Sequence, residues 1–208
     1  MKILDFTSIN FNQCPTDLCV YMEKNKSDKS TRHNYTFVYD FLFNELRNKK
    51  INLFECGLGS KNTNLPCNMG SDARPGSSLF AWSEYFLKGN ILGCDIDDTI
   101  KLDEFKTFVC DQTNPTSIQN MWSNINLDFD IIIDDGYHNF EANCCFFENS
   151  FHKLKKDGIY IIEDIYINNC SKFKNYFKQN DIKHNYVMQL PYRPECLDNC
   201  LAIIIKDF

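Results

Sequence analysis

The stretch FDIIIDDGYH, residues 129–138, joins a nearly continuous apolar run to two aspartates, a glycine and a histidine. An apolar run of this length is typical of a strand that is buried on both faces of a parallel sheet. In sheets of that kind, ligands bind outside the carboxyl ends of the strands. The stretch therefore predicts an inner strand of an α/β sheet, with chemically active side chains directly after it.

Similar short apolar runs alternate with helical patterns along the rest of the chain. The predicted strands are residues 51–56, 90–96, 107–110, 129–133, 159–162, 186–190 and 201–206. The predicted helices are a short one within 14–32, then 34–48, 79–87, a turn at 100–104, 115–125, 140–154 (closed by a glycine stop at Gly158) and 171–179. This alternation predicts an α/β fold with one doubly wound, mostly parallel sheet. No helix separates the last two strands, so the final strand is expected to run antiparallel.

Length and composition limit the class of protein. With 208 residues, the chain is expected to form one domain, in which residues 1–50 are a helical lid or cap and residues 51–208 the core. A hydrophobic content of 43% excludes a disordered chain. The net charge of −6 argues against a nucleic-acid partner.

Targeting and redox signals point to the cytoplasm. The first residues show no charged leader before an apolar run, and no apolar stretch approaches the ~18 residues of a membrane span. The 11 cysteines include no C-x-x-C pair. We therefore expect them to be reduced and to serve as small apolar side chains.

The first predicted strand ends in a glycine turn, Gly57-Leu58-Gly59. Glycines at this place let the backbone turn tightly and approach a ligand. A dinucleotide fingerprint requires a third glycine three residues later, where this chain has Asn62. The turn therefore does not favour NAD, and an ordinary strand-end turn remains the alternative.

The next two strand ends carry side chains that suit a nucleoside. A carboxylate such as Asp95 can accept both hydroxyl protons of a ribose, and Asp111 with Gln112 can read an adenine edge. Each of these residues alone could equally be a solvated strand end or a helix cap. Together they favour S-adenosylmethionine, which has no diphosphate to bind.

Five ionisable residues follow the fourth and fifth strands, namely Asp134, Asp135, His138, Glu163 and Asp164. Several neighbouring carboxylates are costly to bury without a counter-charge. Hard oxygen ligands of this kind select Mg²⁺ or Mn²⁺. His138 has the chemistry of a general base near neutral pH, although a loop histidine that caps the next helix is the alternative.

Two features outside the strand ends remain open. His33 and Tyr35 either belong to a solvated loop or form a lid over the methionine carboxylate of the cofactor. Arg74, in the long loop at residues 60–78, is either a surface residue or a cation for an acidic acceptor group.

Together these motifs resemble the metal-dependent sugar O-methyltransferases of the mycinamicin and macrocin type, which are Rossmann-like S-adenosylmethionine-dependent enzymes. The matching pieces are SDKS (27–30), HNYT (33–36), FECGLG (54–59), PGSSL (75–79), Trp82, GCDI (93–96), DQ (111–112), IDDGYH (133–138) and IED (162–164). The resemblance implies a metal held by Asp135, Glu163 and Asp164, with His138 and Asp135 as catalytic residues. The expected cofactor-binding residues are Glu55, Gly57, Gly59, Ser78, Asp95, Asp111, Gln112, Asp134, His33 and Tyr35.

The expected function is Mg²⁺-dependent O-methylation of a sugar-containing small molecule or a surface-polysaccharide precursor. The alternatives are methylation of a phosphorylated or carboxylated metabolite, and a methyltransferase fold that binds a ligand without catalysis. The expected partner is the small-molecule acceptor alone, and the sequence is compatible with a homo-oligomer.

Overall fold

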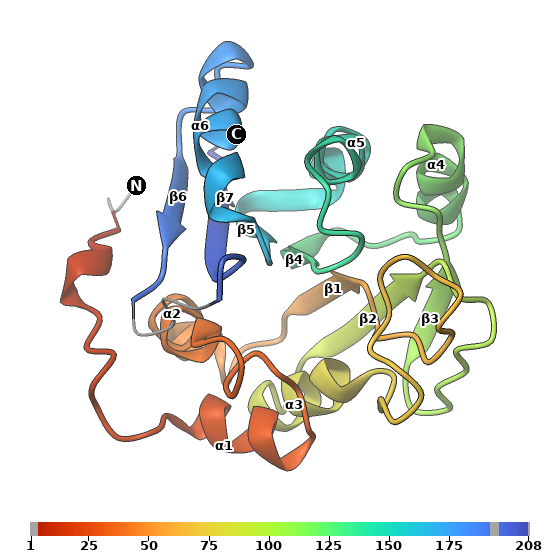
Figure 1. The fold of residues 1–208 in the computed structure, drawn as a ribbon, viewed down its shortest axis with the longest axis horizontal. Coiled ribbons are helices and arrows are strands. Elements are labelled where there is room, and N and C mark those ends of the chain that lie inside the picture. Colours follow the sequence, from red (N-terminus) through yellow and green to blue (C-terminus); the bar gives the residue numbers. More distant parts are fainter. Residues whose placement is uncertain (1–3, 192–195, 208) are drawn as a thin grey trace.

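The computed structural model describes residues 4–191 and 196–207, which form a central sheet between two layers of helices (Figure 1). The seven-stranded sheet has the order β3-β2-β1-β4-β5-β7-β6. Its strands are β1 (Asn52–Cys56), β2 (Asn90–Asp95), β3 (Lys106–Val109), β4 (Phe129–Asp134), β5 (Leu154–Ile162), β6 (Asn185–Gln189) and β7 (Cys200–Ile205).

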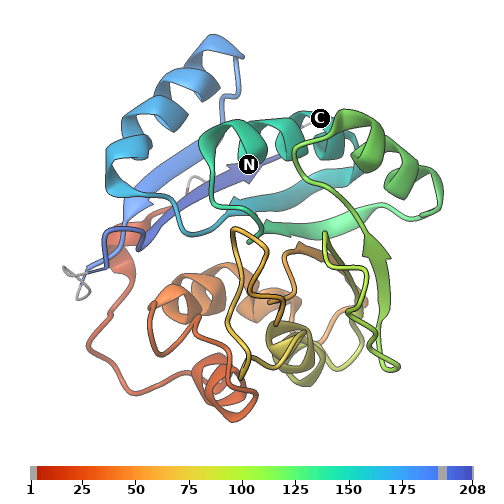
Figure 2. The same ribbon diagram turned by 45° about the vertical axis from the view of Figure 1, so that its right-hand side comes forward.

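Each face of the sheet is covered by helices (Figures 1 and 2). On one face lie α1 (Asp17–Lys24), α2 (Tyr35–Phe43) and α3 (Ser77–Tyr85), and on the other α4 (Pro115–Ser123), α5 (Phe140–Ser150) and α6 (Cys170–Gln179). Short 3-10 turns occupy Phe6–Ser8, Asn44–Leu46, Phe151–Lys153 and Ile167–Asn169. This arrangement is a doubly wound α/β fold with a mostly parallel sheet, as the sequence predicted.

Strand directions also match the prediction. β1 runs parallel to both β2 and β4, and β4 runs parallel to β5. β7 is antiparallel to β5 and β6. The carboxyl ends of β1, β2 and β4 therefore meet at one edge of the sheet.

Apolar side chains form one core on each side of the sheet. Helix α2 contributes Tyr35, Val38, Tyr39 and Phe43, all fully buried, to the core that α1 and α3 share. The residues before β1 are thus packed against the same face of the sheet as α3. Six cysteines are buried as small side chains, namely Cys19, Cys56, Cys94, Cys110, Cys144 and Cys200.

Several predicted element boundaries are wrong, and helix α2 ends at Phe43 rather than at residue 48. Helix α5 ends at Ser150 rather than at residue 154, and β5 already begins at Leu154, which is buried and pairs with Phe129. Gly158 is therefore a strand residue and not a helix stop. Residues 100–104 form a loop with a turn instead of a helical turn. Within the described residues, no helix is long and apolar enough to span a membrane.

Candidate functional site

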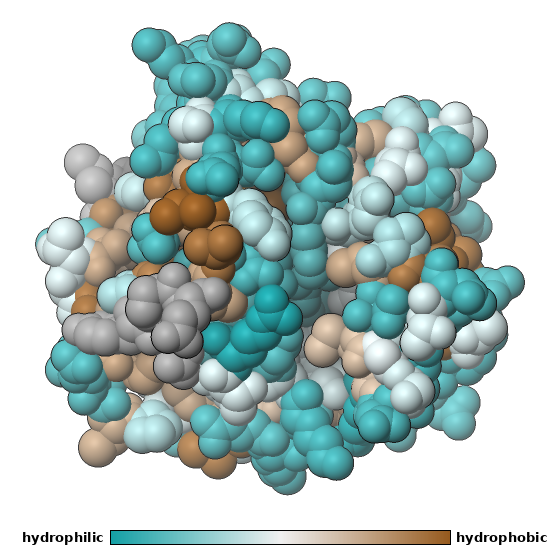
Figure 3. Space-filling view, in the orientation of Figure 1, coloured by the Kyte–Doolittle hydropathy of each residue, from teal (hydrophilic) through white to brown (hydrophobic). Residues whose placement is uncertain are grey.

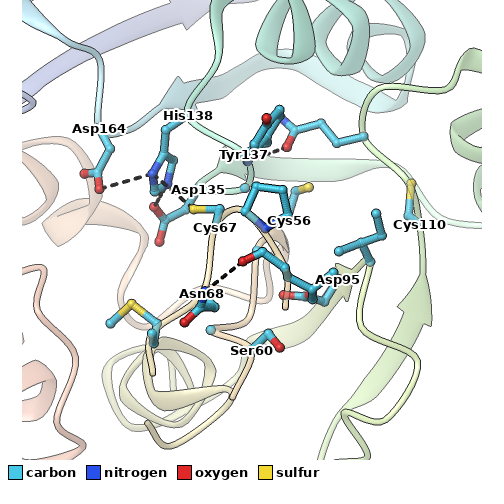
Figure 4. Close-up of a pocket in the computed structure, with 18 of the residues that line it drawn as sticks. Cys56, Ser60, Cys67, Asn68, Asp95, Cys110, Asp135, Tyr137, His138 and Asp164 are labelled. Atoms are coloured by element: carbon cyan, nitrogen blue, oxygen red, sulfur yellow. Dashed lines mark hydrogen bonds and ion pairs between the residues drawn. The ribbon is translucent and has the colours of Figure 1, made fainter. Parts of the chain in front are cut away.

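A cavity of about 300 Å³ lies at the carboxyl ends of β1, β2 and β4 (Figure 4). Strand-end side chains form one wall, and five consecutive loop residues, Leu65 to Met69, form another. Figure 3 shows mainly hydrophilic side chains around the central hollow of this face. The cavity is therefore where the sequence predicted a ligand.

The turn after β1 is held against the end of β4. The Asp135 amide donates to the Cys56 carbonyl at 2.8 Å, and the Gly57 amide donates to the Cys94 carbonyl at 2.8 Å. Gly57 has a φ of +92°, and a Cβ at this position would lie 1.9 Å from the Asp135 carbonyl oxygen. Only glycine permits this approach, which exposes the backbone of the turn to the cavity.

Asp95 lines the cavity at the end of β2. Its Oδ2 accepts from the Leu58 amide at 2.7 Å, and its Oδ1 accepts from the Asp97 amide at 2.9 Å. Burial raises the pKa of Asp95 from its ordinary value. Each carboxylate oxygen keeps a second acceptor position, so a fixed carboxylate is presented to a donor such as a diol.

Gln112 is committed to the protein rather than free to read a base. Its Nε2 donates to Asp134 Oδ1 at 2.6 Å, and its Oε1 accepts from the Tyr137 amide at 2.8 Å. Asp134 is fully buried, also accepts from Asn143 Nδ2 at 3.0 Å, and has its pKa raised to about 7 by burial. Gln112 therefore lines the cavity with an amide whose nitrogen and oxygen are both already hydrogen-bonded to the protein. Asp111 lines the wall beside it.

His138 lies between two aspartates that line the same cavity (Figure 4). Its Nε2 is 3.2 Å from Asp135 Oδ1, and its Nδ1 is 3.7 Å from Asp164 Oδ2. Burial opposes the charged imidazolium, but the bond to Asp135 and nearby negative charge raise the pKa of His138 well above its ordinary value. Asn139, not His138, caps helix α5.

Backbone conformation marks the same residues. His138 and Asp164 have φ values of +56° and +51°, in the left-handed region that is unfavourable for side chains other than glycine. Strained residues of this kind cluster at functional sites.

A buried lysine lies directly beneath this group. Lys29 Nζ is 2.6 Å from Asp135 Oδ2, 2.7 Å from Glu163 Oε2 and 3.2 Å from Glu55 Oε1. Burial alone would raise the pKa of Asp135, but the charges of Lys29 and His138 hold it well below its usual range. Burial does raise the pKa of Glu163 and of Glu55.

Helix α2 supplies further donors to the acidic residues. The Tyr35 hydroxyl donates to Asp164 Oδ1 at 2.8 Å, and the Tyr39 hydroxyl donates to Glu163 Oε1 at 2.5 Å. His33 stacks on the Tyr35 ring at 4.6 Å, with its Nε2 3.5 Å from Asp164 Oδ1. The segment from Lys29 to Tyr39 thus orients the carboxylates at the ends of β4 and β5.

The predicted site residues fall into two groups. Those that line the cavity are Gly57, Gly59, Asp95, Asp111, Gln112, Asp135, His138 and Asp164. Those outside the lining are Glu55, Ser78, Asp134, Glu163, His33 and Tyr35, all buried. His33 and Tyr35 contact Asp164 rather than the cavity. Arg74 also lies outside the lining, and its guanidinium packs over the Phe80 ring at 4.5 Å.

Sequence reasoning gave no role to three residues of the site. Lys29 was visible only as part of the SDKS motif, and Tyr39 lies one helical turn after Tyr35, which was a usable signal. Cys67, whose Sγ is 3.6 Å from His138 Nδ1, comes from the long loop. No local pattern could have placed that thiol beside the histidine.

The acidic residues form two groups with the geometry of a cation site. Asp135, His138 and Asp164 offer ligand atoms within 4.8 Å of one another, and so do Glu55, Asp135 and Glu163. Carboxylate-rich donor sets of this kind suit a hard divalent cation.

Comparisons with known proteins find sequence relatives of this chain among O-methyltransferases. No protein-family model matches the chain. Over 141 residues, the chain is 33% identical to the 8-demethyl-8-alpha-L-rhamnosyl tetracenomycin-C 2'-O-methyltransferase of Streptomyces olivaceus. The matched region covers 67% of this chain and 35% of that protein. Over 136 residues, the chain is 32% identical to the demethylmacrocin O-methyltransferase of Streptomyces fradiae, with 64% and 32% covered. The chain thus spans about a third of the length of the curated relatives it matches.

Solved structures show the same fold. The MycE methyltransferase of the mycinamycin biosynthetic pathway, in complex with Mg and SAH, superposes with a TM-score of 0.71 at 22% identity, over 93% of this chain and 55% of that chain. A second MycE structure, which also contains mycinamycin VI, gives a TM-score of 0.71 at 23% identity, over 92% and 55%.

Proposed function

Because this chain belongs to the family of sugar O-methyltransferases and has a Rossmann-like methyltransferase fold, we propose that it transfers a methyl group from S-adenosylmethionine to a hydroxyl of a sugar-containing small molecule. The observation that carries this proposal is one cavity lined by both Asp95 and the Asp135–His138–Asp164 group. One part of the cavity suits a nucleoside, and the other suits proton removal from a hydroxyl.

The cavity fits the cofactor in shape and in donors. Gly57 leaves the backbone of the β1 turn open where any side chain would collide with Asp135. Asp95 would hold the ribose hydroxyls, and the wall beside Asp111 and Gln112 would face the adenine. When bound, S-adenosylmethionine supplies an activated methyl group on a sulfonium.

The donor set also fits Mg²⁺ or Mn²⁺. Asp135 and Asp164 present carboxylates to the cavity, and Glu163 lies directly behind them. When bound, the divalent cation would lower the pKa of the acceptor hydroxyl and hold it in place. Asp135 and Asp164 are the residues that would hold this ion, because the two oxygens of Glu163 already contact Lys29 and Tyr39.

His138 would take the proton of the acceptor hydroxyl. Its raised pKa depends largely on the charge of Asp135, which also contacts Lys29. A divalent cation held by that carboxylate would lower the pKa of His138, and the neutral imidazole would then be able to accept a proton. The contribution of His138 and Asp164 would then be mainly to orient the acceptor hydroxyl and to remove its proton.

A sugar-containing acceptor fits better than a phosphorylated one. An acidic acceptor needs a cation near the methyl group, and Arg74 is packed on Phe80 outside the cavity lining. The lining is instead rich in acidic and neutral side chains. Within this class we propose small glycosides or a surface-polysaccharide precursor.

The proposal is tested by methyl transfer from radiolabelled S-adenosylmethionine to a panel of glycosides and nucleotide-sugars, with Mg²⁺ and with EDTA. Label should enter a glycoside in Mg²⁺ and not in EDTA. His138→Gln should lower the rate by ~10²–10⁴. Binding of S-adenosylhomocysteine without transfer to any acceptor class would favour a non-catalytic binding domain instead.

A further inference from the structure

The acidic side chains at the site form two triads that share one residue. We call Asp135, His138 and Asp164 the outer triad, because all three line the cavity. We call Glu55, Asp135 and Glu163 the inner triad, because Glu55 and Glu163 are buried beneath it at 0% and 1% exposure. Asp135 directs Oδ1 toward His138 and Oδ2 toward the inner triad.

The inner triad already contains a cation. The Lys29 ammonium lies within 2.6–3.2 Å of one oxygen from each of the three carboxylates, and Lys29 is 2% exposed. No other lysine or arginine of residues 4–191 and 196–207 forms an ion pair with these carboxylates. The ammonium therefore fills the position that the geometry of the inner triad offers to an ion.

The remaining oxygens of the inner triad show how specific this position is. Glu55 Oε2 accepts from Trp82 Nε1 at 2.8 Å, and Glu163 Oε1 accepts from the Tyr39 hydroxyl. Glu55 Oε1 is buried, has no hydrogen-bond partner and is directed at the Lys29 charge at 3.2 Å. Three carboxylates at this depth would repel one another strongly without a positive charge among them.

We propose that Lys29 is a tethered cation that occupies the inner half of a two-cation site and leaves only the outer half to a divalent metal. The inference rests on the proposed function, which assigns a metal to the cavity side of Asp135. Its consequence is that the ligands are held in place without metal. The fixed positive charge of Lys29 also weakens metal binding next to it, because like charges repel across the shared Asp135.

Mn²⁺ titration, followed by electron paramagnetic resonance and calorimetry, tests the proposal on the full chain. Wild type should bind one Mn²⁺. Lys29→Met should either bind a second Mn²⁺ or bind the first roughly tenfold more tightly, since a repelling charge is removed. Lys24→Met is the matched control: this lysine pairs with Glu84 at 2.7 Å on the surface, and its loss should leave Mn²⁺ binding unchanged.

Thermal unfolding distinguishes the tethered cation from a merely structural lysine. Lys29→Met should be destabilised without metal and regain more of its melting temperature on addition of Mn²⁺ than wild type gains. Lys29→Arg, which keeps the charge, should bind Mn²⁺ as wild type does. If Lys29→Met is soluble only when refolded with Mn²⁺, the proposal is supported.

Two outcomes would overturn the proposal. One is that Lys29→Met binds a single Mn²⁺ with unchanged or weaker affinity. The other is that Lys29→Met remains unfolded in the presence of Mn²⁺. Failure of the proposed function would look different. In that case wild type would bind no Mn²⁺, whereas Lys29→Met would still bind one at the vacated inner position.

Discussion

At the scale of single residues, the site depends on one aspartate that serves two environments. Asp135 contacts the imidazole of His138 with one oxygen and the ammonium of Lys29 with the other. Burial alone would raise its pKa, but the charges of Lys29 and His138 hold that pKa well below the usual range and so favour the ionised carboxylate. An ionised, fixed carboxylate at the cavity wall is what a divalent cation requires.

Asp135→Asn should therefore separate metal binding from cofactor binding. We expect it to weaken Mn²⁺ binding at least about tenfold, since mutation of residues that only hydrogen-bond to metal ligands already lowers metal affinity by that factor. The affinity for S-adenosylhomocysteine, measured by calorimetry, should change only a few-fold. Asp128→Asn, an exposed aspartate just before β4, is the control. Equal loss of both ligands in Asp135→Asn would place this residue in the cofactor site instead.

Tyr39→Phe tests whether α2 supports the buried carboxylates. The change removes the hydroxyl that donates to Glu163 and leaves a buried oxygen without its donor. Urea unfolding should show a loss of about 1–3 kcal/mol. Tyr166→Phe, on a half-exposed ring, should change the unfolding free energy little. A Tyr39→Phe protein as stable as wild type would mean that Glu163 finds another donor.

At the scale of elements, the strand ends and the turns that follow them place the chemistry. The apolar runs predicted all seven strands. The inner strands have the simple pattern of strands buried on both faces, whereas the edge strands β3 and β6 are only partly buried. The end of α5 was missed, because Leu154 pairs with Phe129 across the sheet and converts the residues after it to strand. Such tertiary pairing leaves no local signal in the residues around Gly158.

Gly57→Ala should disrupt the junction between β1 and β4. Its added Cβ would lie 1.9 Å from the Asp135 carbonyl oxygen, so the backbone must move. Gly70→Ala is a matched control, because Gly70 has a similar φ of +79° but no atom within 4 Å of an added Cβ. Gly70→Ala should lose only ~1–2 kcal/mol of unfolding free energy. Gly57→Ala should lose more and bind S-adenosylhomocysteine more weakly. Equal losses of unfolding free energy in the two variants would show that the positive φ, and not the close contact with Asp135, requires glycine at position 57.

Asn114→Ala should weaken the start of α4. The Asn114 Oδ1 accepts from the amides of Thr116 and Ser117, and Pro115 follows in the first helical position. Loss of the cap should cost about 1 kcal/mol in urea unfolding. Asn114→Asp keeps an acceptor at this place and should remain close to wild type. A smaller effect of Asn114→Ala than of Asn114→Asp would contradict the assigned cap.

At the scale of the whole molecule, segments far apart in sequence build the site. Lys29 and Glu163 are 134 positions apart, yet their charged atoms are 2.7 Å apart. The sequence indicated which strand ends carry carboxylates, because those residues follow the strands directly. It did not indicate that helix α2 and the loop before it contact those carboxylates, since the contacts exist only after α2 packs on the sheet.

The measurement that tests the proposed methyltransferase most directly is calorimetric titration of the wild-type protein with S-adenosylhomocysteine, with and without Mg²⁺, and with NAD as the control ligand. We expect one molecule bound per chain, with NAD inert and with Asp95→Asn weakened. Absence of binding in both conditions, or tighter binding of NAD, would contradict the assignment of this cavity to S-adenosylmethionine.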